Sequence, residues 1–148
     1  MKKYLLISAV LLLIGYTVAA PGEVVIRQEP LTWQQVGQLE GDELYNNLCA
    51  ACHGADGAGN GAAASVMEKH VPDLTVIAAR NSGVFSHKAV EDVIYGESRV
   101  VAHNTIDMPA WGEQFMYLRP GWNSILRENY ARNRVHALTT HIERLQVE

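Results

Sequence analysis

Apolar residues near the C-terminus recur at helical spacing. Four of them are separated by three, four and three positions: Val135, Leu138, Ile142 and Leu145. Residues at these intervals lie on one face of an α-helix. We therefore predict a last helix over about residues 134–146, or from an earlier start near Asn123, directly after the Pro120-Gly121 break.

Three other segments have weaker helical patterns. In segment 42–51 the apolar residues fall on one side, and Asp42 and Glu43 suit a first turn with its unpaired N–H groups. These apolar residues are Leu44, Tyr45 and Leu48. Ser86 suits the N-cap of a helix that runs to Tyr95 and ends at Gly96. Its inward side would be Val90, Val93 and Ile94. A short helix over residues 74–79 would open at Pro72-Asp73.

The segments between these helices lack strand patterns. Residues 54–61 contain four glycines in eight positions and are predicted to form a loop. No segment alternates with period two over the length of a strand. The predicted fold class is therefore all-α, with short helices and long loops. About 100 residues of this kind build a thin core, so we expect a large, flat, apolar cofactor to fill it.

The N-terminus has the features of a targeting segment. Lys2 and Lys3 precede an uncharged, mostly apolar stretch from residue 4 to residue 22. This pattern predicts a signal peptide over residues 1–20, cut after Ala19 or Ala20, although Pro21 disfavours the second cut. The alternative is an uncleaved membrane tether over residues 4–20. Both place the domain in the periplasm, soluble or anchored to the inner membrane. Residues 21–40 are predicted to be a linker or arm, and residues 41–148 the domain.

The charge of the chain restricts its partners. Without Lys2 and Lys3, ten basic residues face 16 acidic ones, a formal charge of −6. Nucleic-acid binding requires clustered Lys and Arg against the phosphates, so nucleic acid is not an expected partner. The balance favours a protein that meets neutral or basic partner surfaces.

The strongest motif is Cys49-Ala50-Ala51-Cys52-His53. This spacing is that of c-type haem attachment: both sulfurs lie on one side of a helical turn, and the histidine follows directly. A thioredoxin-type dithiol would follow a strand, and none is predicted. A zinc site of this kind would need two further soft ligands, and the chain has no other cysteine. We therefore predict one covalent haem c, attached at Cys49 and Cys52, with His53 as an axial iron ligand.

From about Gly41 to the C-terminus the chain resembles a monohaem class I cytochrome c. Four features carry the resemblance: Cys49–Gly54, Val71-Pro72-Asp73-Leu74, Met108-Pro109-Ala110-Trp111-Gly112, and the helix ending at Leu145. The cytochromes c′ differ, because their motif lies near the C-terminus. The resemblance implies the class I fold, in which short helices wrap one haem and the first and last helices cross. Tyr45 and Leu48 should then meet Leu138, Ile142 or Leu145.

The resemblance also implies the second iron ligand. Met108 precedes Pro109 and lies 55 residues after His53, in the family's place. A thioether ligand raises the reduction potential. The alternatives are Met67, Met116 and, for a bis-histidine haem, His103.

Four further residues are expected to surround the haem: Pro72, Leu74, Arg99 and Trp111. The Pro72 carbonyl would hold the His53 ring, and Leu74 would pack against that ring. Trp111 would cover the haem or form ordinary core. Arg99 is the first choice to neutralise the propionates, with Arg80 and His103 as alternatives.

With His53 and Met108 both bound, the iron would have no open position. The expected function is outer-sphere electron transfer between redox partner proteins, and not catalysis. One alternative is a haem-bearing subunit of a larger dehydrogenase or oxidase, which would use residues 118–133 and the N-terminal arm as contact surfaces. A catalytic or gas-sensing haem would need a vacant or displaceable sixth ligand.

Overall fold

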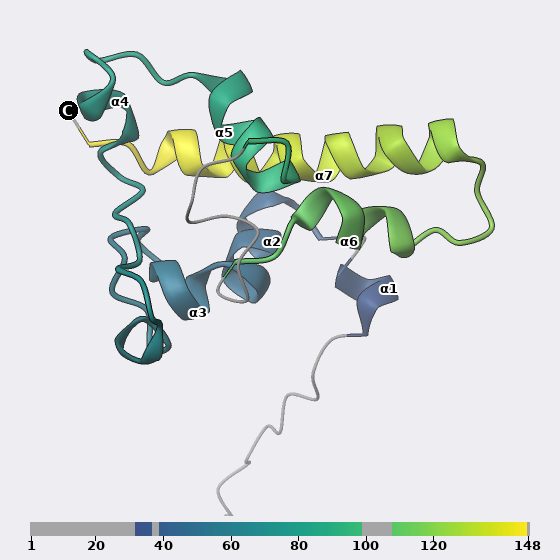
Figure 1. Ribbon diagram of the computed structural model, residues 1–148, viewed down its shortest axis with the longest axis horizontal. Helices are drawn as coiled ribbons and strands as arrows, with labels where there is room; N and C mark the ends of the chain where they lie inside the picture. Colours follow the sequence, from purple (N-terminus) through teal and green to yellow (C-terminus); the bar gives the residue numbers. More distant parts are fainter. Residues whose placement is uncertain (1–31, 37–38, 99–107, 148) are drawn as a thin grey trace, which may run out of the picture. The chain divides into compact units, whose positions relative to one another are not determined.

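The computed structural model describes residues 32–36, 39–98 and 108–147 (Figure 1). These described residues form seven α-helices and one 3₁₀ turn at Ala64–Val66. The helices are α1 (Trp33–Val36), α2 (Gly41–Leu48), α3 (Ala50–His53), α4 (Ile77–Arg80), α5 (His87–Tyr95), α6 (Trp111–Tyr117) and α7 (Ser124–Arg144). No strand occurs among the residues described, so the predicted all-α class is confirmed.

Helix α7 is the longest element, with 21 residues, and it contacts α2, α5 and α6 (Figure 1). The earlier of its two predicted starts is confirmed, because the Asn123 side chain caps it by accepting a hydrogen bond from the Leu126 N–H at 2.9 Å. The predicted apolar stripe is buried at Val135, Leu138 and Ile142. The longer helix also buries Ala131, which lies outside the 134–146 range. One helix thus supplies a surface for most of the core.

The crossing of α2 and α7 joins the first part of the domain to the last. A Cβ at Gly41 would overlap the carbonyl of Ala137, so the two backbones touch where only glycine fits. Leu44 and Tyr45 are completely buried in the core cluster that also contains Leu138 and Ile142. The predicted contact between the first and last helices is confirmed.

Helix α5 follows its prediction closely. The Ser86 hydroxyl accepts a hydrogen bond from the Ala89 N–H at 3.4 Å, and Gly96 ends the helix in the left-handed conformation. Of its three predicted inward residues, Ile94 is buried and Val90 and Val93 are half-buried.

Other boundaries differ from the predictions. The predicted 42–51 helix is two helices, because Cys49, with φ of −117°, departs from regular helical geometry between α2 and α3. The predicted 74–79 helix begins later, at Ile77, because the Asp73 carboxylate accepts hydrogen bonds from both the N–H and the hydroxyl of Thr75 and holds a turn there.

Two helices were not predicted. Helix α6 buries Trp111 and Phe115, one turn apart, against the core. Helix α1 lies within the segment 21–40, and its Val36 is buried in the core cluster.

Several predicted features lie outside the described residues. They are the targeting segment 1–20, Arg99 and His103. Within the described ranges, no helix combines the length and the apolar character needed to cross a membrane.

Candidate functional site

The two cysteines and His53 lie on a single turn that follows α2. The Cys49 carbonyl accepts hydrogen bonds from the N–H groups of Cys52, at 3.1 Å, and of His53, at 2.9 Å. Both cysteines are half-buried free thiols, whereas the His53 side chain is buried. The turn therefore presents two sulfurs and one imidazole within five consecutive residues, from the N-cap of α3 and from the end of that short helix.

The ring of His53 is held by the backbone of Pro72. His53 Nδ1 lies 3.3 Å from the Pro72 carbonyl oxygen. Since a carbonyl only accepts hydrogen bonds, Nδ1 carries the proton and Nε2 keeps its lone pair for a metal. Burial lowers the pKa of His53, and the Pro72 hydrogen bond opposes this shift more weakly. His53 is therefore a neutral imidazole with one nitrogen available as a ligand.

The glycine-rich loop 54–61 positions that carbonyl. The Gly59 N–H donates to the His53 carbonyl at 2.8 Å, and the Leu74 N–H donates to the Gly57 carbonyl at 2.7 Å. A Cβ on Gly59 would lie 2.6 Å from the Val71 oxygen and 3.2 Å from the Pro72 oxygen. The loop thus joins the cysteine turn to the segment that carries Pro72, with no room for a side chain between them.

Two adjoining cavities, of about 70 Å³ and about 280 Å³, open beside this turn. They share five lining residues: Cys49, His53, Pro72, Met108 and Trp111. Cys52 lines the smaller cavity and Leu74 the larger one. Helix α5 contributes Val90, Val93 and Ile94 to the larger cavity, and α7 contributes Ile142. Thus every predicted site residue that the structure describes lines one or both cavities.

The structure separates the methionine candidates for the second ligand. Met108 lines both cavities, and Met67 lines the smaller one. The Met116 sulfur instead lies 3.9 Å from the Tyr95 hydroxyl, and this side chain lines a different cavity with Ser124 and Ile125. Among the described methionines, Met108 and Met67 therefore remain as candidates for the second iron ligand.

Arg80, one of the alternatives to Arg99 for the propionates, lies beside the site. It lines the larger cavity, and its guanidinium donates to the Asp73 carbonyl at 3.4 Å. Arg99, the first choice for the propionates, lies outside the described residues. Lys69 and His70 line the smaller cavity and were not singled out. No local sequence pattern marks these two residues as site residues. They line the cavity only because the 62–73 segment passes beside it in the fold.

The lining and the donor groups fit a haem better than they fit a dithiol or zinc. Burial and the neighbouring Cys52 raise the pKa of Cys49 to about 12, whereas a redox dithiol needs a lowered thiol pKa. Among the described residues, no three-ligand metal cluster includes either cysteine. A mostly apolar cavity edged by two thiols, an imidazole and a thioether suits a flat apolar group with a central iron.

The comparisons with known proteins agree with this site. The family model that matches the chain is that of cytochrome c, over residues 38–132. This span includes the cysteine turn, the Pro72 segment, the Met108 loop and the first part of α7. No curated protein and no solved structure matches the chain significantly.

Proposed function

The chain belongs to the cytochrome c family, and from that premise we propose that it is a periplasmic single-electron carrier with His53 and Met108 as iron ligands. Family membership establishes the cofactor, covalent haem c, and the general activity, haem-based electron transfer. When bound, the haem supplies a one-electron couple at its iron.

One observation carries the ligand assignment: His53 and Met108 line the same two cavities beside Cys49. Cys49 and Cys52 would hold the haem covalently, and the Pro72 carbonyl orients His53. Trp111, which is buried, and the aliphatic side chains of α5 exclude water from the cavity wall. With His53 and Met108 both holding the iron, it would offer no position for a substrate. The protein would then transfer electrons to partner proteins through the haem edge.

A matched set of methionine variants tests the ligand. Met108→Leu, Met67→Leu and Met116→Leu each remove one sulfur and roughly keep the volume. We expect the oxidised far-red sulfur–iron band to vanish and the potential to fall in Met108→Leu alone. The reduced form of that variant should also bind carbon monoxide. Loss of the band in Met67→Leu would transfer the assignment to Met67.

Two measurements on the wild-type protein test the electron-carrier proposal itself. Carbon monoxide binding to the reduced wild-type haem at neutral pH would mean a displaceable sixth ligand, and it would favour catalysis or gas sensing. Absence of a covalent haem from protein produced with the cytochrome c maturation machinery would overturn the proposal.

The periplasmic location rests on the N-terminal sequence, in which two lysines precede an uncharged apolar stretch. Mass spectrometry of the protein recovered from a periplasmic fraction tests it. A chain that starts at residue 20 or 21 would indicate cleavage and a soluble carrier. An intact chain in the membrane fraction would indicate a tether over residues 4–20. Recovery of haem-free protein from the cytoplasm would contradict both.

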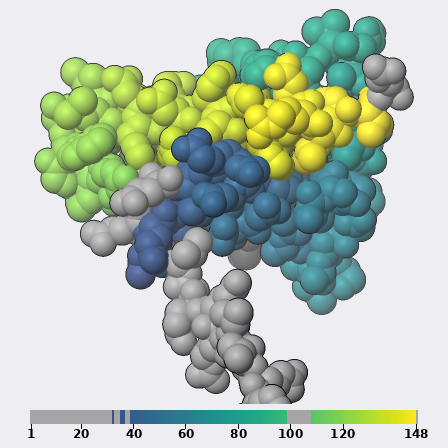
Figure 2. Space-filling model, turned by 180° about the vertical axis from the view of Figure 1, so that it is seen from behind, coloured from purple at the N-terminus to yellow at the C-terminus, as the bar shows by residue number. Residues whose placement is uncertain are grey.

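A second candidate function is that of an electron-transfer subunit in a larger dehydrogenase or oxidase. The observation that favours it is a group of exposed apolar side chains near the connection between α6 and α7. This segment is light green in Figure 2. These side chains are Tyr117, Trp122, Ile125 and Leu126, of which Ile125 is 70% exposed. Co-migration of the haem with a dehydrogenase or oxidase in native gels, lost in Ile125→Asp, would favour this alternative. Migration as a small protein on its own would favour the carrier.

A further inference from the structure

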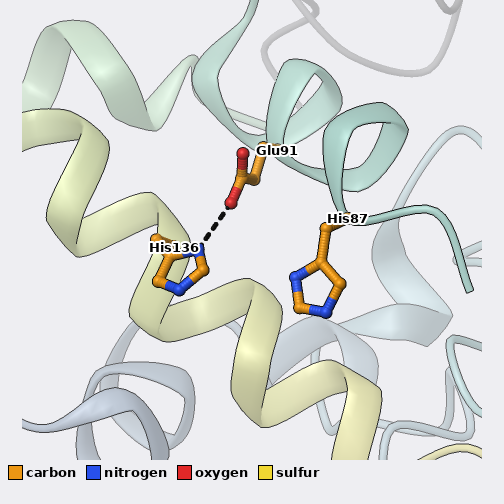
Figure 3. A group of neighbouring side chains, drawn as sticks. All are labelled: His87, Glu91 and His136. Atoms are coloured by element: carbon orange, nitrogen blue, oxygen red, sulfur yellow. Dashed lines mark hydrogen bonds and ion pairs between the residues drawn. The ribbon is translucent and has the colours of Figure 1, made fainter.

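Three side chains that the haem site does not use meet where α5 packs against α7 (Figure 3). His87 begins α5, Glu91 follows one turn later on the same face, and His136 lies within α7. One ligand atom from each lies within 4.8 Å of the others. These are the residue types of a transition-metal site, and they come from two helices that already touch.

His87 is oriented like a metal ligand. Its Nε2 lies 2.9 Å from the Glu143 carboxylate, so Nε2 carries the proton. Its Nδ1 is buried and has no hydrogen-bond partner among the described residues. In Figure 3 a ring nitrogen of His87 faces Glu91 and His136. A buried nitrogen without a partner is costly, whereas metal-bound histidines usually donate their other N–H to a carboxylate in this way.

The other two ligands are already brought together. His136 Nδ1 lies 2.8 Å from the Glu91 carboxylate, drawn as a dashed line in Figure 3. The His136 side chain is 64% exposed, so an ion can enter from solvent. A dication could replace the His136–Glu91 hydrogen bond with two coordinate bonds and give His87 Nδ1 its missing partner. The carboxylates of Glu91 and Glu143 would balance its charge.

We propose that His87, Glu91 and His136 form a zinc-binding site, with Glu143 as the residue that orients His87. Two imidazoles, one carboxylate and a water complete the four-coordinate geometry that Zn²⁺ adopts. The site goes beyond the electron-carrier function and uses none of the haem ligands. A bound ion would join α5, which lines the larger haem cavity through Val90, Val93 and Ile94, to α7. The ion would hold α5, and with it one wall of that cavity, in a fixed position against α7.

Calorimetric titration of the chelator-treated holoprotein with zinc chloride tests the proposal. We expect one zinc ion per chain. His136→Asn and Glu91→Gln should each weaken zinc binding at least about tenfold, and Glu143→Gln should weaken it by about 10–100-fold. The matched control is Glu113→Gln, which removes the same charge from an exposed position on α6 and should leave zinc affinity unchanged. The haem spectrum of every variant should match that of the wild type.

Thermal unfolding gives a second readout. Zinc should raise the melting temperature of the wild-type holoprotein and not that of His136→Asn, because an ion that binds only the folded state stabilises it. Equal zinc affinity in the wild type, His136→Asn and Glu91→Gln would overturn the proposal, since the ion would then lie elsewhere. A loss in Glu113→Gln as large as that in Glu91→Gln would also overturn it, because it would mean that zinc responds only to net charge.

Discussion

Replacing Gly59 by alanine should disturb His53, the proposed iron ligand, although no contact between the two side chains is involved. Gly59 has a φ of +77°, and a Cβ there would lie 2.6 Å from the Val71 oxygen and 3.2 Å from the Pro72 oxygen. The Pro72 oxygen is the atom that accepts the hydrogen bond from His53 Nδ1. An added methyl group must therefore push this backbone segment away, and the His53 hydrogen bond should lengthen.

The expected loss of stability has two parts. An L-residue with left-handed backbone geometry costs about 1–2 kcal/mol. Forcing an extra carbon into a packed site costs about 1–3 kcal/mol. We expect Gly59→Ala to lower the free energy of unfolding by about 2–5 kcal/mol. Urea unfolding of the holoprotein, followed by circular dichroism, measures this change.

The potential should also change, with a definite sign. In the proposed site, the Pro72 hydrogen bond would make His53 a stronger electron donor to the iron, and this would stabilise the ferric form. Weakening it should therefore raise the reduction potential. If the bond stabilises the ferric form by about 1 kcal/mol more than the ferrous form, the rise is about 40 mV, since a tenfold change in a one-electron equilibrium corresponds to about 59 mV. Spectroelectrochemical titration measures it.

Gly83 provides the matched control. Its φ is +82°, almost that of Gly59, but apart from its own chain neighbours no described residue has an atom within 4 Å of a Cβ built there. Gly83→Ala should thus show only the backbone cost of about 1–2 kcal/mol and an unchanged potential. If both variants lose the same stability and both keep the wild-type potential, the contact between Gly59 and the Pro72 segment does not position His53, and the reasoning is refuted.

Three further substitutions have defined outcomes. Tyr45→Phe should cost about 1 kcal/mol in urea unfolding, because the buried Gly54 carbonyl loses its 2.9 Å bond from the tyrosine hydroxyl but keeps one from Gly57. Thr139→Val should stabilise the protein by about 1 kcal/mol, because the Thr139 hydroxyl is buried without a partner among the described residues. Burial and the nearby Arg144 lower the pKa of His141, so between this pKa and 6.5 the unfolded chain binds more protons. Stability should therefore fall as the pH drops below 6.5, and less so in His141→Gln.

Each of these outcomes can be contradicted by the same unfolding experiments. A loss well above 2 kcal/mol in Tyr45→Phe would mean that the ring itself repacks, and not only that one hydrogen bond is lost. Destabilisation by Thr139→Val would reveal a partner for the hydroxyl. An equal acid-side loss of stability in wild type and His141→Gln would assign the pH dependence to other groups.

Local sequence determined the ends of α5 and α7 and the turn that carries Cys49, Cys52 and His53. Ser86 and Asn123 cap α5 and α7 as their residue types predict, because a side-chain cap acts within three residues. The spacing of Cys49, Cys52 and His53 predicts a single turn, because the separation of residues one turn apart is set by helix geometry alone. The stripe on α7 predicts a buried face, because a 3.6-residue period is independent of what covers it.

Tertiary structure decided the features that join distant segments. Helix α6 has only seven residues, too few to be stable alone, and it exists because Trp111 and Phe115 pack into a core built by α5 and α7. Arg80 lines the larger cavity together with Ile142 of α7, which lies 62 positions later in the chain. His87 and His136 are 49 positions apart and meet only because α5 lies on α7. Long-range contacts depend on which surfaces are buried together, and local propensity in a sequence does not specify that.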